Sequence, residues 1–476
     1  MENILERIVS VGNTILWSYV LIFMLIVLGL YFTVKTKFVQ FRFFGEMFRL
    51  LTEGANKSIT GEKKKGISSF QAFCISTASR VGTGNLAGVA IAVSVGGPGA
   101  VFWMWLIALI GAGSSFVEST LAQIYKVKDE NGYRGGPAYY MEKALNMRWM
   151  GIIFSVLITL CFGLVFNSVQ ANTITLAFEQ AFGMNRFMVG IIITIITGLV
   201  IFGGIKRIAK VAEFIVPIMA TAYVLVALFI IIKNITVIPS LLSLILSSAF
   251  GLKQAVGGGM GAALMMGIKR GLFSNEAGMG SAPNAAATAE VSHPVKQGLI
   301  QTLGVFTDTL LICSATAFIL LISGVYTTKG LKGIQLTQMA LSSQVGTWGN
   351  TFIAFCILLF AFSSIIGNYY YGESNIEFIN GSKVWLFLYR SAVVLMVLWG
   401  SKSSIKIVWD MADLFMGMMA LINLIAILML GKIAFKALDD YTRQKREGKD
   451  PVFYADSIKG LENVDCWEKR KELKIG

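Results

Sequence analysis

Two short stretches of this sequence place glycines beside polar side chains within long apolar runs. One reads VGTGN at residues 81–85, and the other reads SNEAGMGS at residues 274–281. Glycine permits a sharp turn and lets a ligand approach the backbone closely. A helix broken at such a point exposes amides that can bind a carboxylate and carbonyl oxygens that can bind a hard cation such as Na⁺. The two stretches therefore predict a binding site for both kinds of charge.

Close helix packing is the competing explanation for glycine in an apolar helix. We favour packing for GGGMGAAL at residues 257–264, where no polar side chain accompanies the glycines. The other two stretches also contain hydroxyl, amide or carboxyl side chains, so we favour a binding site there.

Both stretches belong to predicted membrane helices. Hydrophobic residues make up 55% of the 476 residues and charged residues only 14%, and the mean hydropathy is +0.68. The apolar runs are long and do not alternate, which predicts helices and not a β-barrel. We predict an all-α polytopic membrane protein with about 11 transmembrane helices, at residues 14–34, 68–95, 98–125, 150–181, 187–204, 210–232, 257–288, 297–323, 350–371, 384–401 and 405–431. The segments at 38–54 and 237–253 predict interfacial helices.

The distribution of charge predicts the topology. The formal net charge is +14, but most basic residues fall in alternate loops between the apolar runs. This pattern predicts an extracellular N-terminus and a cytoplasmic C-terminus in the cell membrane, and it gives no reason to expect nucleic acid as a partner. The sequence has one histidine, no CxxC pair and no HExxH or GxSxG pattern. We therefore predict no zinc site, no disulfide framework, no catalytic residues and no enzyme activity.

The two interrupted helices each open a group of five predicted spans. Because five is an odd number, the second group runs opposite to the first, which is the inverted repeat of many secondary transporters. The predicted domains are an N-terminal transmembrane helix with an interfacial helix at 1–67, the first repeat at 68–236, an interfacial helix at 237–256, the second repeat at 257–432 and a charged, solvated cytoplasmic tail at 433–476.

Three stretches resemble the alanine or glycine:cation symporter family. They are SRVGTGNLAGVAIAVSVGGPGAVFWMW at 79–105, ESTLAQIYKVKDENGYRGGPAYYM at 118–141 and RGLFSNEAGMGSAPNAAATAEVSHPVKQG at 270–298. That family is similar to the wider amino acid–polyamine–organocation group. The resemblance implies a leucine-transporter-like 5+5 inverted repeat, here with one extra N-terminal helix. It also implies sodium-coupled uptake of alanine or glycine, with Na⁺ as coupling ion and no other cofactor.

The resemblance also implies a substrate site. The amides of Thr83 and Gly84 would bind the substrate carboxylate, and Gly82 would leave room for it. The remaining substrate contacts would come from the fourth span and from the second interrupted helix, namely Gln170, Phe273, Ser274, Glu276, Gly278 and Met279. Phe273 would cap the substrate.

Two sodium sites follow from the same resemblance. Asn85 would line the first. The carbonyls of Ala78 and Val81 would form the second with the hydroxyls of Ser363 and Ser364.

Ionisable residues near mid-membrane are costly, and each is a functional hypothesis. We predict that Arg80 pairs with Glu276, with Lys269 and Arg270 as rival partners of that carboxylate. Asp308 could bind an ion, carry a proton or make a polar helix contact.

Glu118 and Glu213 lie closer to the predicted cytoplasmic side. For these two glutamates we expect structural salt bridges with loop lysines.

Three alternative functions are less well supported by the residues. A channel requires rings of like residues, whereas this chain has two different interrupted helices. A membrane enzyme requires a catalytic set, which is not evident. Proton coupling is the alternative to sodium, because Glu276 and Asp308 could relay protons. The expected partners are alanine or glycine, Na⁺ and the lipid bilayer, and the sequence leaves the oligomeric state open.

Overall fold

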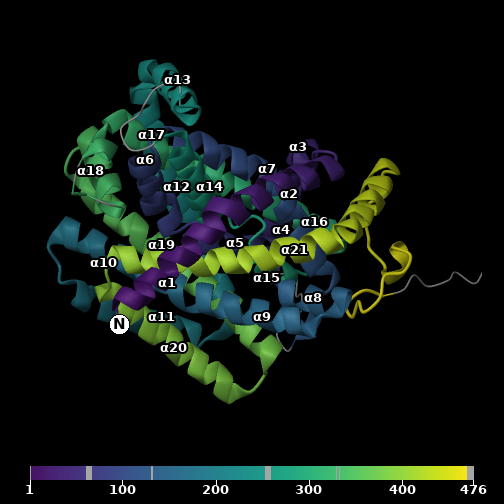
Figure 1. The fold of residues 1–476 in the computed structure, drawn as a ribbon. Helices are drawn as coiled ribbons and strands as arrows, with labels where there is room; N and C mark the ends of the chain where they lie inside the picture. Colours follow the sequence, from purple (N-terminus) through teal and green to yellow (C-terminus); the bar gives the residue numbers. More distant parts are fainter. Residues whose placement is uncertain are drawn as a thin grey trace, which may run out of the picture.

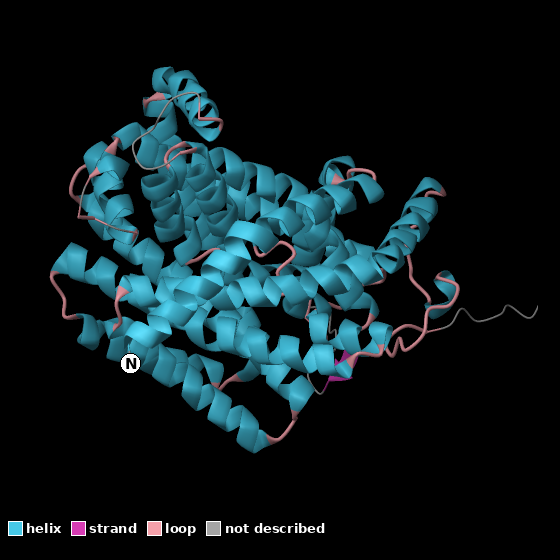
Figure 2. Ribbon diagram, viewed as in Figure 1, coloured by secondary structure: helices cyan, strands magenta, loops and turns pink. Residues whose placement is uncertain are grey.

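The computed structural model is almost entirely helical (Figures 1 and 2). It describes residues 2–59, 67–129, 132–251, 259–328, 330–331 and 333–468, without the side chains of residues 2–5 and 56–59. Within these residues the only strands are β1 (Val127–Asp129) and β2 (Gly132–Arg134), which form an antiparallel hairpin. The boundary predicted between residues 256 and 257 lies outside the described residues.

Helices account for nearly all of the remaining elements. The α-helices are α1 (Glu2–Ile15), α2 (Leu21–Lys35), α3 (Val39–Arg42), α4 (Phe44–Ile59), α5 (Ser69–Arg80), α6 (Val89–Gly96), α7 (Gly99–Ile124), α8 (Pro137–Leu145), α9 (Arg148–Ile158), α10 (Asn167–Phe182), α11 (Arg186–Ile201), α12 (Gly204–Lys233), α13 (Ile238–Ala249), α14 (Met260–Asn275), α15 (Ala282–Thr288), α16 (Pro294–Val305), α17 (Ser314–Ser323), α18 (Ile334–Val345), α19 (Trp348–Ile379), α20 (Lys383–Lys402) and α21 (Ile405–Arg446). Short π-helical segments are η1 (Leu16–Val20), η2 (Gly84–Gly88), η3 (Thr159–Phe166) and η5 (Phe306–Cys313), and 3₁₀ turns are η4 (Ile235–Val237), η6 (Val325–Thr327) and η7 (Ala455–Ser457).

Among the described residues, eight helices are long and apolar enough to cross a membrane. They are Glu6–Lys35, Gly99–Ile124, Arg148–Phe182, Gly204–Lys233, Pro294–Ser323, Trp348–Ile379, Lys383–Lys402 and Ile405–Arg446. The other three predicted spans contain the shorter helices α5 and α6, α11, and the pair α14 and α15. The all-helical, multi-pass architecture is thus confirmed, while the count of 11 spans and the inverted repeat stay predictions.

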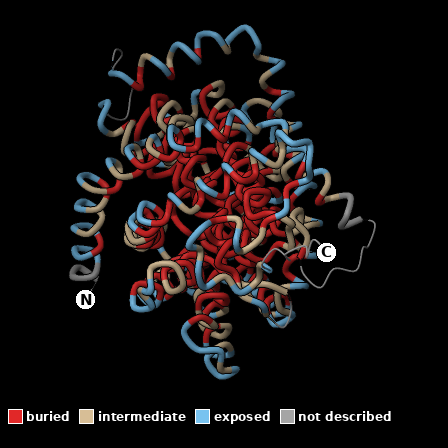
Figure 3. Tube along the Cα trace, turned by 90° about the vertical axis from the view of Figure 1, so that its right-hand side faces the viewer, coloured by how far each residue is buried: buried red, intermediate tan, exposed pale blue. Residues whose placement is uncertain are grey.

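The spans divide into central and peripheral helices. In the most apolar window of α7 and of Pro294–Ser323, 72% of the residues are buried, against 28% in α12 and in α20. Figure 3 shows the buried residues gathered in the middle of the bundle. Because α12 and α20 expose large apolar side chains such as Phe214, Phe229 and Leu395, they form surfaces suited to lipid.

Both predicted interruptions are present, and each contains a glycine that a larger residue could not replace without a clash or strain. Between α5 and η2, a Cβ on Gly82 would lie 2.2 Å from Ser364 Oγ. Between α14 and α15, Gly278 and Gly280 have φ angles of 84° and 85°, which suit glycine and strain other residues. Glu276 also has a positive φ of 58° and ends α14 as its C-cap.

The chain after α21 folds back onto the bundle. We call residues 447–468 the C-terminal clasp. Its Phe453 N–H donates to the Ser292 carbonyl (2.9 Å), and Trp467 Nε1 donates to the carbonyl of Gln123 at the end of α7 (3.1 Å). Asp450 and Asp465 pair with Lys296 and Lys143, respectively. The charged side chains of the clasp are mostly exposed, as predicted for a solvated tail, but Phe453 and Ile458 are buried against the bundle. Residues 469–476 lie outside the described residues.

Candidate functional site

The two interrupted helices meet in the centre of the bundle. Asn85 Nδ2 of η2 donates to Ser274 Oγ at the end of α14 (3.0 Å). Ser79 Oγ of α5 donates to Glu276 Oε1 in the second break (2.8 Å). All four residues are buried. Three predicted site residues, Asn85, Ser274 and Glu276, therefore come together from positions far apart in the sequence.

The first break offers amide groups to oxygen acceptors. The amide of Thr83 donates to Gln170 Oε1 of α10 (3.0 Å), and the amide of Gly82 donates to Asn85 Oδ1 (2.9 Å). Gln170 is thus in contact with the break, and its role in substrate binding stays a prediction. Its side-chain oxygen accepts the hydrogen bond of the Thr83 amide, which is the amide that we expect to bind a substrate carboxylate.

An oxygen cluster lies on the other side of the same break. Ser364 Oγ of α19 is 2.8 Å from the Ala78 carbonyl oxygen and 3.4 Å from that of Val81. Both serine hydroxyls contact the Phe360 carbonyl (2.9 Å for Ser363 and 3.0 Å for Ser364), but Ser363 is turned toward Met219 Sδ (3.9 Å) and not toward the break. Three of the four predicted ligands of the second sodium site are therefore together, and their hard oxygens suit Na⁺.

The second break is closed by a residue that the sequence analysis placed elsewhere. Glu118 of α7 is fully buried, and its carboxylate accepts hydrogen bonds from the amides of Gly278 (3.0 Å) and Gly280 (3.1 Å). Asn423 Nδ2 of α21 also donates to it (2.8 Å). The predicted salt bridge of Glu118 with a loop lysine is wrong. The amide of Gly278 is engaged by Glu118, and the neighbouring Met279 is completely buried.

The predicted pairing of Arg80 with Glu276 is also wrong. Both side chains are described, and no ion pair joins them. Glu276 instead accepts hydrogen bonds from Ser79 and from Ser281 Oγ (2.6 Å). Arg80 Nη1 donates to the Gln301 carbonyl (3.2 Å), while its Nε and Nη2 are buried without a hydrogen-bond partner. The buried cation is therefore only partly satisfied.

Asp308 lies against the two interrupted helices. Its carboxylate accepts hydrogen bonds from Asn85 Nδ2 (2.6 Å), Ser274 Oγ (2.6 Å) and Thr309 Oγ1 (2.9 Å). Asp308 is completely buried. Of the alternatives that the sequence left open, a polar helix contact is present, and an ion-binding role stays a prediction.

Buried carboxylates outnumber buried cations around the breaks. Arg80 attracts Glu118, Glu276 and Asp308 electrostatically without forming an ion pair with any of them. With all four groups ionised, the cluster has two excess negative charges. Uncompensated buried charge is costly, so this arrangement favours the entry of a cation or a proton.

Aromatic rings cover the first break. Phe273 stacks on Phe166 with a centroid distance of 4.5 Å, and it packs on Trp409 at 4.8 Å. A Cβ on Gly84 would lie 2.9 Å from Phe273 Cδ1. The ring of Phe273 therefore lies close to Gly84, and its role as a substrate cap stays a prediction.

A cavity of about 870 Å³ lies above this aromatic cover and reaches Arg270, Trp409 and Asp413. Arg270 Nη2 pairs with Asp413 Oδ2 (2.5 Å), and Lys269 Nζ lies 3.4 Å from the same oxygen. These two cations therefore pair with α21 and not with Glu276. Trp409 lines the cavity and packs on Phe273, which covers Gly84, so these two rings lie between the cavity and the first break.

Comparisons with known proteins place this arrangement among transporters. The model of the sodium:alanine symporter family matches residues 1–455. The chain is 61% identical over 467 residues to the probable sodium/glutamine symporter GlnT of Bacillus subtilis, covering 98% of this chain and 97% of that protein. It is 56% identical over 472 residues to the amino-acid carrier protein AlsT of the same organism, covering 99% and 100%.

Two more distant likenesses add to this comparison. A sodium/proton-dependent alanine carrier protein of a Bacillus species is 39% identical over 450 residues, covering 90% of this chain and 99% of that protein. The crystal structure of a manganese transporter of Eremococcus coleocola, in complex with an aromatic bis-isothiourea compound, matches with a TM-score of 0.50. It has 13% sequence identity and covers 80% of this chain and 88% of that chain, so it reports on the fold alone.

Proposed function

Because this chain belongs to the sodium:alanine symporter family and is a multi-pass, sodium-coupled amino-acid symporter, we propose that it carries alanine and glycine into the cell. The first break supports this proposal best, because the amide of Thr83 and the carbonyl oxygens of Ala78 and Val81 lie close together there. The break thus offers a donor for a carboxylate beside acceptors for a cation. Each bound charge would offset the other, so each ligand would bind more tightly in the presence of its partner.

The carboxylate of the amino acid binds at the start of the helix that resumes after the break. The first amides of a helix have no intrahelical partner and carry positive partial charge. In the proposed sequence of events, Gln170 Oε1 leaves the Thr83 amide when the substrate arrives. The substrate then contacts Thr83 and Gly84, under the ring of Phe273. Ser274, Glu276, Gly278 and Met279 complete the proposed pocket, with Gly82 leaving space for the ligand.

Sodium binds to the oxygens of Ala78, Val81 and Ser364 in this proposal. We leave Ser363 out of this site, because its hydroxyl contacts Met219 Sδ and the Phe360 carbonyl and not the oxygens of Ala78 or Val81. Asn85 is proposed to line a further sodium site. It would do so with Asp308, which is in contact with it.

We propose that transport proceeds by alternating access in a 5+5 inverted repeat, with the N-terminus outside and the C-terminus in the cytoplasm. The cavity above Trp409 would then be the extracellular vestibule, and the clasp would lie on the cytoplasmic face. The positive-inside distribution of basic residues supports this orientation.

Glutamine is a second candidate substrate. The relative with 61% identity is named a probable sodium/glutamine symporter, and the buried amides and hydroxyls near Gln170 could bind a polar side chain. Proton coupling is a second candidate mechanism, because one relative is named sodium/proton-dependent and the breaks contain an excess of buried carboxylates.

Purified protein in liposomes can test these proposals. Uptake of labelled alanine is expected to rise with an inward sodium gradient and to persist when the pH gradient is collapsed. Equal uptake driven by protons without sodium would contradict sodium coupling. Unlabelled glycine is expected to compete with alanine, whereas leucine competes poorly because Phe273 and Met279 leave little room. If glutamine competes better than glycine, the second candidate substrate is preferred.

A further inference from the structure

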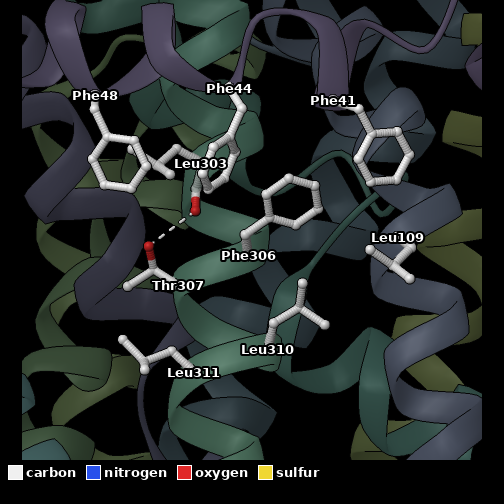
Figure 4. A pocket seen from close by; sticks show the side chains of 9 residues that line it. All are labelled: Phe41, Phe44, Phe48, Leu109, Leu303, Phe306, Thr307, Leu310 and Leu311. Atoms are coloured by element: carbon white, nitrogen blue, oxygen red, sulfur yellow. Dashed lines mark hydrogen bonds between the residues drawn. The ribbon is translucent and has the colours of Figure 1, made fainter.

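An apolar groove opens on the outside of the bundle beside the α3–α4 corner, far from the breaks in sequence. Three of its rings, Phe41, Phe44 and Phe48, come from α3 and α4, and a fourth, Phe306, comes from η5. Figure 4 shows these rings turned toward a common space, with Leu109, Leu303, Leu310 and Leu311 completing the walls. We call this space the phenylalanine groove; its volume is about 510 Å³.

The phenylalanine groove is both accessible and apolar. Phe41, Phe44 and Phe48 are 52%, 46% and 49% exposed, respectively. Thr307 is the one polar side chain in the lining, and its hydroxyl donates to the carbonyl of Leu303 (3.0 Å; Figure 4). An exposed apolar surface of this kind marks a binding or membrane-contact site, and in a membrane protein its natural occupant is a hydrocarbon chain.

A basic cavity of about 370 Å³ adjoins the same corner. Lys37 and Arg42 line it from the N-terminal side, and Arg443 and Arg446 line it from the end of α21. Its remaining lining residues are Asp439, Thr442 and Glu447. The lining thus contains four basic and two acidic side chains, which favours an anionic ligand.

Several of these cations form no ion pair. No ion pair joins Lys37, Arg42 or Arg446 to a carboxylate in the described part of the chain, whereas Glu447 is already paired with Lys449 (2.6 Å). Burial and the nearby charge of Arg446 lower the pKa of Arg42, against the smaller opposite effect of Asp439 in the same lining. The guanidinium groups therefore repel each other, and a phosphate between them would relieve this repulsion.

The α3–α4 corner is fixed in place against the bundle. Lys37 and Phe38 have positive φ angles of 55° and 56° and turn the chain sharply after α2. Gln40 is buried, and its Nε2 donates to Thr33 Oγ1 (2.9 Å) and to the Leu109 carbonyl (3.1 Å). The corner therefore holds the two cavities in a preformed arrangement, with Phe41 lining one and the adjacent Arg42 lining the other.

The corner is also tied to α21 on the side of the basic cavity. Tyr441 donates its hydroxyl hydrogen to Glu46 of α4 (2.6 Å), and Lys445 pairs with the same carboxylate (3.2 Å). The end of α21 and the corner thus form one unit, which keeps Arg446 beside Arg42.

We propose that the α3–α4 corner binds an anionic phospholipid, with its phosphate between Lys37, Arg42 and Arg446 and an acyl chain in the phenylalanine groove. Charge complementarity selects the headgroup, and the adjacent apolar groove selects a lipid over free phosphate. The back wall of the groove is η5, whose Asp308 contacts Asn85 and Ser274 on its other side. The lipid therefore packs against the segment that supports the central site.

Native mass spectrometry of the detergent-purified full chain tests this proposal. The protein is titrated with dioleoyl phosphatidylglycerol, dioleoyl phosphatidylcholine, dihexanoyl phosphatidylglycerol or inorganic phosphate. The anionic long-chain lipid is expected to bind at least about tenfold more tightly than the other three. Equal affinity for the two dioleoyl lipids overturns the headgroup assignment. Equal affinity for the short-chain lipid or for phosphate overturns the groove assignment.

Paired variants locate the site. Arg42→Gln with Arg446→Gln is expected to weaken dioleoyl phosphatidylglycerol binding about thirtyfold, since each cation near the membrane surface contributes comparably. The matched control is Lys206→Gln with Arg207→Gln, two exposed basic residues at the start of α12, which should leave binding unchanged. An equal loss in both double variants means nonspecific attraction and refutes the site. The wild-type comparisons above decide the proposal even where a variant is poorly folded.

Discussion

Removing the hydroxyl of Ser364 is expected to weaken sodium binding selectively. In Ser364→Ala, the cluster with Ala78 and Val81 loses one of its oxygens, and the Ala78 carbonyl loses a hydrogen bond of 2.8 Å. The bound ion then lacks one buried oxygen, and losing one such polar interaction costs the sodium-bound state about 1–3 kcal/mol, which corresponds to a sodium affinity weaker by roughly 5- to 150-fold. The measurement is the sodium concentration for half-maximal alanine uptake in liposomes, at saturating alanine.

The neighbouring serine provides the matched control. Ser363→Ala removes the same chemical group from the same helix turn. Both hydroxyls contact the Phe360 carbonyl within α19, but only that of Ser364 also reaches the Ala78 and Val81 carbonyl oxygens. We expect the half-maximal sodium concentration of Ser363→Ala to change less than about threefold, because only a bond within the helix is lost. Equal shifts in the two variants, or no shift in Ser364→Ala, would refute the assignment of the sodium oxygens.

The remaining predictions concern the two breaks and the membrane-surface loops. Gly84→Val should abolish alanine binding in monodisperse protein, because even a Cβ there lies 2.9 Å from Phe273; near-normal affinity by titration would place the carboxylate elsewhere, and alaninamide should not be transported by the wild type. Glu118→Gln should lower the stability by about 1–3 kcal/mol, because the carboxylate accepts two backbone amides, and an unchanged melting temperature would contradict this. Burial lowers the pKa of Lys126 to about 7, so between about pH 7 and 10.5 the unfolded chain binds a proton that the folded chain does not. Stability should therefore rise with pH across that window, and Lys126→Met should flatten the rise in thermal unfolding; a parallel rise in the variant would argue against it.

The positions of the two breaks could be predicted because their signal is local. A glycine next to a polar side chain in an apolar run is visible without any knowledge of the fold, as at Gly82 and Gly278. The contact between Asn85 and Ser274 required more, namely a family resemblance that brings the two helices together.

The contacts of the other site residues could not be predicted, because the sequence does not give the direction in which each side chain points. Ser363 and Ser364 are adjacent in sequence, but neighbouring residues in a helix point about 100° apart, so only the rotation of α19 decides which one meets Ala78. Arg80 has a long side chain that can reach several acceptors, and composition does not select Gln301 among them. Glu118 was misplaced for another reason. A buried carboxylate in a membrane helix signals a function, but its position toward the predicted cytoplasmic side favours a structural salt bridge with a loop lysine.

The C-terminal clasp has a practical consequence for following this protein by fluorescence. Of its five cysteines, Cys74, Cys161, Cys313 and Cys356 are buried, and Cys466 in the clasp is partly exposed. A thiol-reactive dye applied to the unmutated chain therefore attaches preferentially to the clasp, without the need for a cysteine-free background. The indole of Trp467 lies next to that position in the sequence and is bonded to the end of α7, so a dye on Cys466 sits where the clasp meets the bundle. An environment-sensitive dye there would shift its emission when the clasp separates from the bundle and the site enters water.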